Sequence, residues 1–266
     1  MLGGSPRRAA VAGLAATRGI PVGHTGAVDT DSASKAPKLG PSDGPDLPEP
    51  LAGIVEAVLK PRLRGWLHFG AAPLAFVLGL ILMVITPTAG LRAAVAVYVL
   101  TTVLLFGVSA AYHLGAGSPK VNHFLHKLDH ANIYMFIAGS YTPFAAALPS
   151  ATMAWTVLAL VWGIALAGLV VRVAWSEAPR WLVTASYLGL GWVAIFFLPT
   201  FYRDLGAATV VLLGIGGVLY SVGGVIYARK KPNPWPQWFG FHELFHACTI
   251  AAYLVQYVAV AMVVTA

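Results

Sequence analysis

Charged residues and cysteine are scarce in this 266-residue chain. Only 10% of its residues are Asp, Glu, Lys or Arg, whereas 58% are hydrophobic, and the mean hydropathy is +0.74. Soluble domains carry about 25% charged residues, so this composition excludes a soluble protein and indicates a polytopic membrane protein. A single cysteine, Cys248, allows no internal disulfide and excludes zinc motifs built on cysteine. Any metal must therefore be held by histidine and carboxylate.

The first 50 residues lack a hydrophobic run long enough to span a membrane. They are rich in Gly, Ala, Pro and Ser and hold five basic and five acidic side chains. This composition buries too little apolar surface to fold. We expect residues 1–52 to be a disordered tail or an extension that is not native to the protein. Residues 53–266 are the predicted membrane domain.

Seven runs of about twenty apolar residues follow, and each can cross a hydrocarbon core of about 30 Å as a helix. We place them at 66–86, 91–113, 129–148, 152–172, 181–200, 206–228 and 241–264. The predicted fold class is therefore an all-α integral membrane protein, a seven-transmembrane-helix bundle.

Basic residues fall mostly on one side of this predicted bundle. Ten of the seventeen Lys and Arg lie before the first run or in the loops after the second, fourth and sixth: Lys60, Arg62, Arg64, Lys120, Lys127, Arg172, Arg180, Arg229, Lys230 and Lys231. The loops of the opposite side offer Arg92 and Arg203. The positive-inside rule then predicts a cytoplasmic N-terminus and a C-terminus outside. The formal net charge of +7 thus indicates topology and no nucleic-acid binding.

Histidines occur where hydropathy predicts few polar residues. His242 and His246 stand four residues apart at the start of the seventh run, so they share one face of a helix. Ser109 and His113 repeat this spacing near the end of the second run, and Asp129 opens the third. In the predicted topology these residues lie at the inner ends of their helices, with Ser109 one turn deeper. We expect them to converge at one depth.

A catalytic zinc requires three protein ligands, here imidazoles, and one open coordination position, because the zinc ion activates a water molecule bound at that position. His113, His242 and His246 fit this count and are the predicted ligands of one Zn2+. Asp129 is then the predicted proton acceptor or orienting partner for that water. Ser109 could hydrogen-bond the water, a ligand histidine or a substrate carbonyl.

The remaining polar residues of the helices have less specific interpretations. We expect His123, His126 and His130 to be surface or lipid-headgroup residues, whereas His68, one turn into the first run, is a candidate for lining the cleft. Polar stripes also follow two helices, through Thr249, Tyr253 and Gln256 in the seventh run and through Asn132 and Ser140 in the third. Such stripes are typical of helix packing, and a cavity for water or a lipid headgroup would need them equally.

Four segments together resemble the hemolysin III family, the bacterial branch of the progestin and adipoQ receptors. They are SAAYH at 109–113, LDHANIY at 128–134, AGSYTPF at 138–144 and FGFHELFH at 239–246. The resemblance runs from about residue 56 to the end of the chain. It implies seven helices, a cytoplasmic amino end and a zinc ion held by three histidines.

The resemblance also implies roles for individual residues. His113, His242 and His246 match the zinc ligands, and Asp129 and Ser109 match the residues beside the metal-bound water. One segment departs from the family pattern. Where the family often has an acidic residue and an Asn before a Thr-His pair, this chain has Arg64 and Leu67-His68, so a role of that first motif does not transfer.

Three functions stay open on the sequence. The first is a zinc hydrolase of lipid amides or esters at the cytoplasmic leaflet, since eukaryotic relatives of the family are associated with ceramide hydrolysis. The second is a non-enzymatic membrane effector, signalling or cytolytic, with structural zinc. The third takes His242-Glu243-x-x-His246 as a metalloprotease motif with Glu243 as general base. The expected partners are membrane lipids and no nucleic acid, and the expected location is a bacterial plasma membrane.

Overall fold

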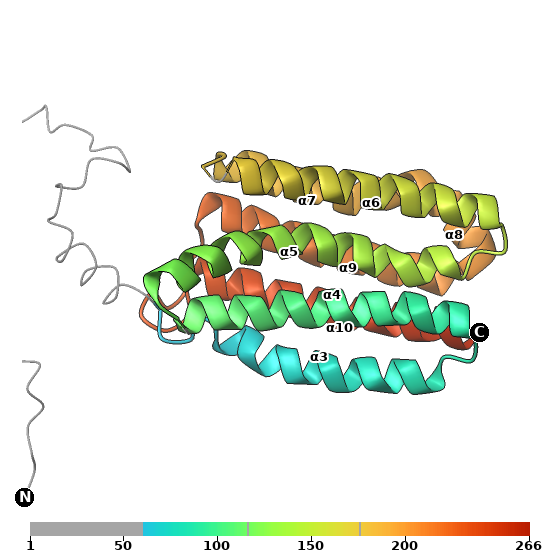
Figure 1. Ribbon diagram of the computed structural model, residues 1–266, viewed down its shortest axis with the longest axis horizontal. Helices are drawn as coiled ribbons and strands as arrows, with labels where there is room; N and C mark the ends of the chain where they lie inside the picture. The colour runs from blue at the N-terminus through green and yellow to red at the C-terminus, as the bar shows by residue number, and fades with distance from the viewer. Residues whose placement is uncertain (1–60, 116, 176) are drawn as a thin grey trace, which may run out of the picture. The chain divides into compact units, whose positions relative to one another are not determined.

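The computed structural model describes residues 61–115, 117–175 and 177–266, and the regular elements in these ranges are helices (Figure 1). They are α3 (Trp66–Ile85), α4 (Ala89–Leu114), α5 (Pro119–Ala146), α6 (Ala151–Ala174), α7 (Arg180–Gly191), the 3-10 helix η3 (Trp192–Phe197), α8 (Leu198–Leu205), α9 (Ala207–Arg229) and α10 (Phe241–Thr265). The predicted extension at 1–52 lies outside the described residues.

Six helical segments of this part of the chain are long and apolar enough to cross a membrane. They are Trp66–Ile85, Ala89–Leu114, Ala151–Ala174, Arg180–Leu205, Ala207–Arg229 and Phe241–Thr265. Each corresponds to one of the predicted runs. The prediction of a helical multi-pass membrane protein is therefore confirmed, whereas the seventh span, α5, and the orientation of the bundle stay predictions.

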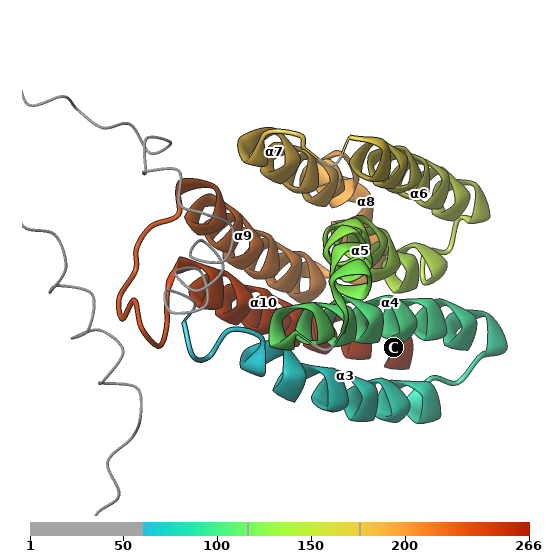
Figure 2. The same cartoon turned by 60° about the vertical axis from the view of Figure 1, so that its left-hand side comes forward.

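α5 differs from the other long helices because it lies among them. It packs against α4, α6, α7 and α10, and Figure 2 shows it between α4 and α6. Twelve of its residues are buried. A helix enclosed by other helices does not face lipid, so its sequence need not be strongly apolar. α5 also begins at Pro119 instead of 129, because proline suits the first turn of a helix and the polar segment after it continues the same helix.

The fifth run is not the single α-helix that was predicted. α7 gives way to η3, and Pro199 stands at the start of α8. The proline ring has no N–H and excludes the carbonyl four residues earlier from α-helical geometry, which is that of Ile195. Tyr141 of α5 stabilises the break: its hydroxyl donates to the Gly191 carbonyl (2.6 Å) and accepts the Ala194 N–H (2.8 Å).

Small residues bring α9 close to its neighbours. A Cβ atom at Gly223 would lie 3.0 Å from Cβ of Cys248 on α10, and one at Gly224 would lie 3.3 Å from side-chain atoms of Thr184 and Leu188 on α7. Glycine at these two positions therefore allows close helix packing. They also hold α9 against the helix that carries two of the histidines.

Candidate metal centre

The start of α10 is fixed by two side-chain acceptors. Glu243 Oε2 accepts the Gly240 N–H (2.8 Å), and Asn233 Oδ1 accepts the N–H of the first residue of α10 (2.8 Å). These bonds satisfy two of the N–H groups that a helix start leaves unpaired. Because the start is fixed, His242 and His246 project from the first two turns on one face.

The end of α4 is fixed by two glycines in the left-handed region. Gly115, with φ 74°, ends the helix just after His113, and its N–H bonds back to the last turn. Gly65, with φ 90°, precedes α3, and a Cβ atom there would lie 2.9 Å from Cβ of His113. Both positions favour glycine. The start of α3 can therefore lie directly against the turn that carries His113.

The three histidines predicted to bind zinc lie together. One ring nitrogen of each lies within 4.8 Å of those of the other two, and Nε2 of His113 is 3.0 Å from Nε2 of His242. The exposed fractions are 2% for His246 and 7% for His113. Two nitrogens bound to one tetrahedral zinc stand roughly 3.4 Å apart, close to the spacing observed. The cluster could therefore hold a metal ion.

Asp129 and Ser109 lie beside this cluster. Oδ2 of Asp129 is 3.7 Å from Nε2 of His113, and Ser109 is within hydrogen-bonding reach of the Asp129 carboxylate. Asp129 comes from α5 and Ser109 from α4, so three helices contribute to the group. The structure thus brings all five predicted residues together, while their chemical roles stay predictions.

His68 adds a fourth imidazole at the same place. Its ring stacks on that of His246, with 3.7 Å between the ring centroids and 11° between the planes. The residue is 3% exposed, and neither ring nitrogen has a hydrogen-bond partner among the described residues. It lines the same cavity as Ser109 and Asp129, in agreement with the cleft interpretation.

An ion pair between Arg64 and Glu243 lies at the entrance to α10. Glu243 is fully buried, and its carboxylate both pairs with Arg64 and accepts the Gly240 N–H. Sequence reasoning missed this contact because the partners are 179 residues apart. It explains how the chain accommodates the charge of Arg64 beside a buried carboxylate.

His130 is not the surface residue that was predicted. It is half-buried, and its Nδ1 lies 2.9 Å from the His126 carbonyl oxygen. Its Nε2 lies 3.4 Å from the Tyr227 hydroxyl, and both His130 and Tyr227 line the cavity. Because α5 packs against helices on several sides, Asp129 and the residue after it both meet protein.

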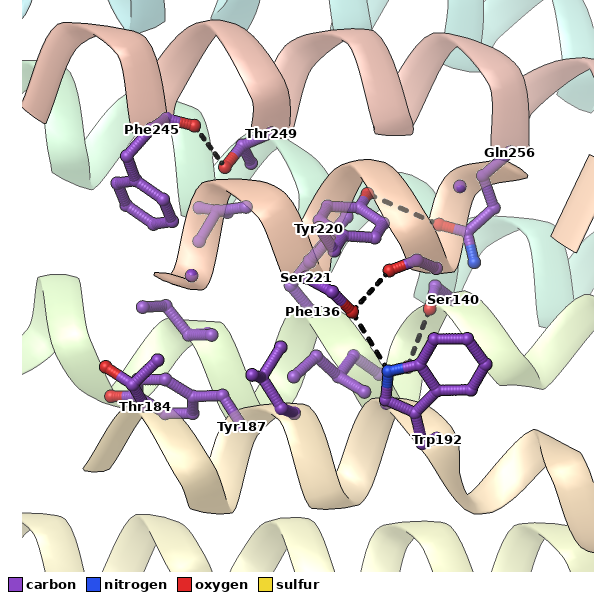
Figure 3. Close-up of a pocket in the computed structure, with 18 of the residues that line it drawn as sticks. Phe136, Ser140, Thr184, Tyr187, Trp192, Tyr220, Ser221, Phe245, Thr249 and Gln256 are labelled. Atoms are coloured by element: carbon purple, nitrogen blue, oxygen red, sulfur yellow. Dashed lines mark hydrogen bonds between the residues drawn. The ribbon is translucent and has the colours of Figure 1, made fainter. Parts of the chain in front are cut away.

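A largely apolar cavity of about 170 Å³ opens from the histidine cluster and runs between α5, α7, α9 and α10. Figure 3 shows part of its lining, including Ser140, Thr249 and Gln256 from the predicted polar stripes. The other stripe residues serve packing: Asn132 donates to the Leu104 carbonyl (3.2 Å), and Tyr253 packs in the apolar core. Some residues of the polar stripes therefore line a cavity, and others serve helix packing.

Comparison with known proteins points to one family. The sequence matches the family model of haemolysin-III related proteins over residues 57–257. It is 39% identical over 112 residues to the Hemolysin-3 homolog of Bacillus subtilis (strain 168), a match covering 42% of this chain and 53% of that protein. It is 33% identical over 144 residues to Hemolysin-3 of Bacillus cereus, covering 54% of this chain and 65% of that protein. The matches thus span between half and two thirds of these relatives.

Similarity extends more weakly to eukaryotic receptors. The Progestin and adipoQ receptor-like protein 1 of Caenorhabditis elegans is 27% identical over 178 residues, covering 58% of this chain and 40% of that protein. The Adiponectin receptor protein of Drosophila melanogaster is 24% identical over 177 residues, covering 58% and 39%. The histidine cluster, Asp129 and Ser109 all lie within the residues that the family model matches. The chain belongs to the haemolysin-III related family.

Proposed function

We propose that this protein crosses a bacterial plasma membrane seven times and holds Zn2+ at its cytoplasmic side. The ten basic residues on the side of the histidine cluster support this orientation. α5 supports the seventh span, because its 28 residues give a helix about 42 Å long. The histidine-rich, cysteine-free set of His113, His242 and His246 suits zinc among the common metals.

The reaction proposed for this site is hydrolysis of a lipid amide or ester. When bound, zinc supplies a Lewis acid that polarises the carbonyl group and activates water. Asp129 accepts a proton from the attacking water, whose oxygen bonds to the acyl carbon. The C–N or C–O bond then breaks, and the leaving group takes up that proton. Ser109, within reach of the carboxylate, orients Asp129 for this transfer.

The observation that carries the proposal is the position of the histidine cluster at one end of a largely apolar cavity. His242, His246 and Asp129 line the cavity together with apolar side chains of the helices beyond them. An acyl chain lying among these side chains leaves its amide or ester group beside the histidines. Substrate sites of this type combine an apolar lining with a few polar groups that fix orientation.

Metal content tests the zinc site directly. Purified protein should contain close to one zinc per chain, and the double change His242→Ala with His246→Ala should remove it, because one remaining imidazole cannot hold the ion tightly. His123→Ala is the matched control, since this exposed histidine lies outside the cluster. Near-stoichiometric zinc in the double variant contradicts the assignment. The parent should also release fatty acid from a panel of lipid amides and esters.

The alternative is a membrane effector in which zinc is structural. The name of the Bacillus cereus relative, Hemolysin-3, indicates a membrane-perturbing activity for that protein. A parent that binds zinc and hydrolyses no amide or ester of the panel supports this second function. Lysis of lipid vesicles by the purified protein then measures it.

A metalloprotease that uses Glu243 as general base receives no support. The carboxylate is buried, pairs with Arg64 and accepts the Gly240 N–H. A general base has to be within reach of the water it deprotonates. Glu243 instead fixes the start of the helix that carries the two histidines.

A further inference from the structure

The cavity continues far beyond the histidine cluster. Phe245, Thr249 and Gln256 of α10 all line it, and Figure 3 shows Phe245 and Gln256 toward opposite ends of the view. Gln256 follows His246 by ten residues, which corresponds to about 15 Å along a helix. The far end of the cavity therefore lies well inside the bundle.

Polar side chains surround this far end. Ser140 comes from α5, Trp192 from η3, Tyr220 and Ser221 from α9, and Gln256 from α10. A polar group inside a membrane protein is costly unless it is hydrogen-bonded. Each of these five side chains therefore needs a hydrogen-bond partner.

Four of the five donate a hydrogen bond to a protein acceptor, and for Tyr220 that acceptor is Gln256 Oε1. The hydroxyls of Ser140 and Ser221 each donate to a carbonyl of their own helix at 2.7 Å. The indole N–H of Trp192 donates to Ser221 Oγ at 2.9 Å, a contact drawn in Figure 3. These bonds join η3 to α9 and explain why the polar atoms are tolerated there.

Gln256 is only half satisfied. Its Oε1 accepts the Tyr220 hydroxyl at 3.4 Å, and its amide nitrogen makes no hydrogen bond to the described residues. Turning the amide over would exchange the two atoms, but one half of the group would again lack a partner. The side chain lines the cavity, so the open half of the amide is available to a ligand.

We propose that Gln256 binds a hydroxyl group carried part-way along a lipid chain, so that the cavity prefers hydroxylated acyl chains. This inference rests on the proposed function for the position of the acyl head beside the histidines. The separation of about 15 Å then places the hydroxyl roughly twelve carbons along an extended chain. The chain before and after it meets apolar residues such as Phe136 and Leu213.

Competition binding to the purified parent protein tests the preference. The competitors are octadecanoic acids, either unsubstituted or with one hydroxyl near the carboxyl group, near mid-chain or near the methyl end, displacing a fluorescent fatty acid. One hydrogen bond in the protein should make the mid-chain isomer bind about 2- to 10-fold tighter than the others. Equal binding of the four acids, or no binding of any, overturns the proposal.

Two variants on the same helix localise the preference. Gln256→Leu keeps the size of the side chain and removes both polar atoms, so the mid-chain isomer should lose its advantage while the unsubstituted acid binds as before. Thr249→Val is the control, because the Thr249 hydroxyl already donates to the Phe245 carbonyl (3.0 Å) and the preference should persist. A preference that survives Gln256→Leu overturns the assignment.

The competition series also separates this inference from the proposed hydrolase. A parent that prefers the mid-chain isomer and hydrolyses no lipid keeps the binding role of Gln256 and contradicts the enzyme. A parent that hydrolyses lipids and binds the four acids equally keeps the enzyme and contradicts the role of Gln256. The positional series needs no variant, so it decides the question even if Gln256→Leu fails to fold.

Discussion

A carboxylate beside three imidazoles can hold the cluster together or take part in chemistry, and Asp129→Asn separates these roles. The change is nearly isosteric and removes one charge next to His113. Because three histidines suffice for a site with an open position, the variant should keep its zinc, while hydrolysis should fall by about 100-fold or more through loss of the proton acceptor. Zinc analysis and fatty-acid release from one preparation measure both. Full turnover in the variant contradicts the proposed role.

Breaking the Arg64–Glu243 pair should lower the stability of the protein and leave its activity unchanged. Glu243→Gln can still accept the Gly240 N–H but leaves Arg64 without its counter-ion. Since the Arg64 side chain is 19% exposed, the loss should be on the order of 1–2 kcal/mol, less than for a fully buried pair. Thermal unfolding in detergent should occur at a lower temperature, and zinc binding and lipid hydrolysis below that temperature should persist.

The additional change Arg64→Gln serves as the control for this variant. It removes the unpaired charge, so the double variant should regain part of the lost stability. Loss of all lipid hydrolysis in a folded, zinc-loaded Glu243→Gln variant would contradict a purely structural role for Glu243 and return the metalloprotease motif to consideration.

The sequence predicts which side chains share one face of a helix. It does not predict contacts between residues that are far apart in the chain. The four-residue spacings of His242 with His246 and of Ser109 with His113 are visible in the sequence, because a helix places such residues on one face. The Arg64–Glu243 pair and the burial of His130 have no local signal. They depend on how α3, α5 and α10 meet, which the sequence of any one helix does not specify.

Among the helices, α9 offers a clean test of close packing. Gly223→Val adds a Cβ that would lie 3.0 Å from Cβ of Cys248 and two further methyl groups, so α9 and α10 have to move apart. Overpacking of this kind costs about 1–3 kcal/mol. Gly214→Val is the matched control, since a Cβ there meets nothing within 4 Å. Gly223→Val should unfold at a clearly lower temperature than Gly214→Val. Equal unfolding temperatures would show that close approach of α9 and α10 at Gly223 does not contribute to stability.

The limits of sequence prediction for the helices follow from what hydropathy measures. It reports residues that face lipid, so it located the six apolar helices, and of α5 it located only the apolar part from residue 129 onward. Hydropathy did not predict the start at Pro119, because the first turns of α5, before its apolar part, are polar. The break at η3 depends on Pro199 and on the Tyr141 hydroxyl from another helix, and apolar composition records neither.

For the whole molecule, the open question is which end of the bundle faces the cytoplasm, and α5 provides the test. Ser118 precedes α5 at the end near the histidines, Ser150 follows it at the other end, and both are exposed. In a background where Cys248 is replaced by alanine, a cysteine at either position is the only thiol. An impermeant maleimide on intact cells should label Ser150→Cys, and it should label Ser118→Cys only after the membrane is permeabilised.

The same pair of variants tests the seventh span. If α5 crosses the membrane, the two cysteines lie on opposite sides and must differ in labelling. Labelling of both on intact cells, or of neither, would mean that α5 does not cross, and six spans would remain. Labelling of Ser118→Cys alone would invert the topology and place the histidine cluster at the outer leaflet. The acyl head of a lipid substrate would then lie at the outer leaflet, because His242 and His246 line the cavity.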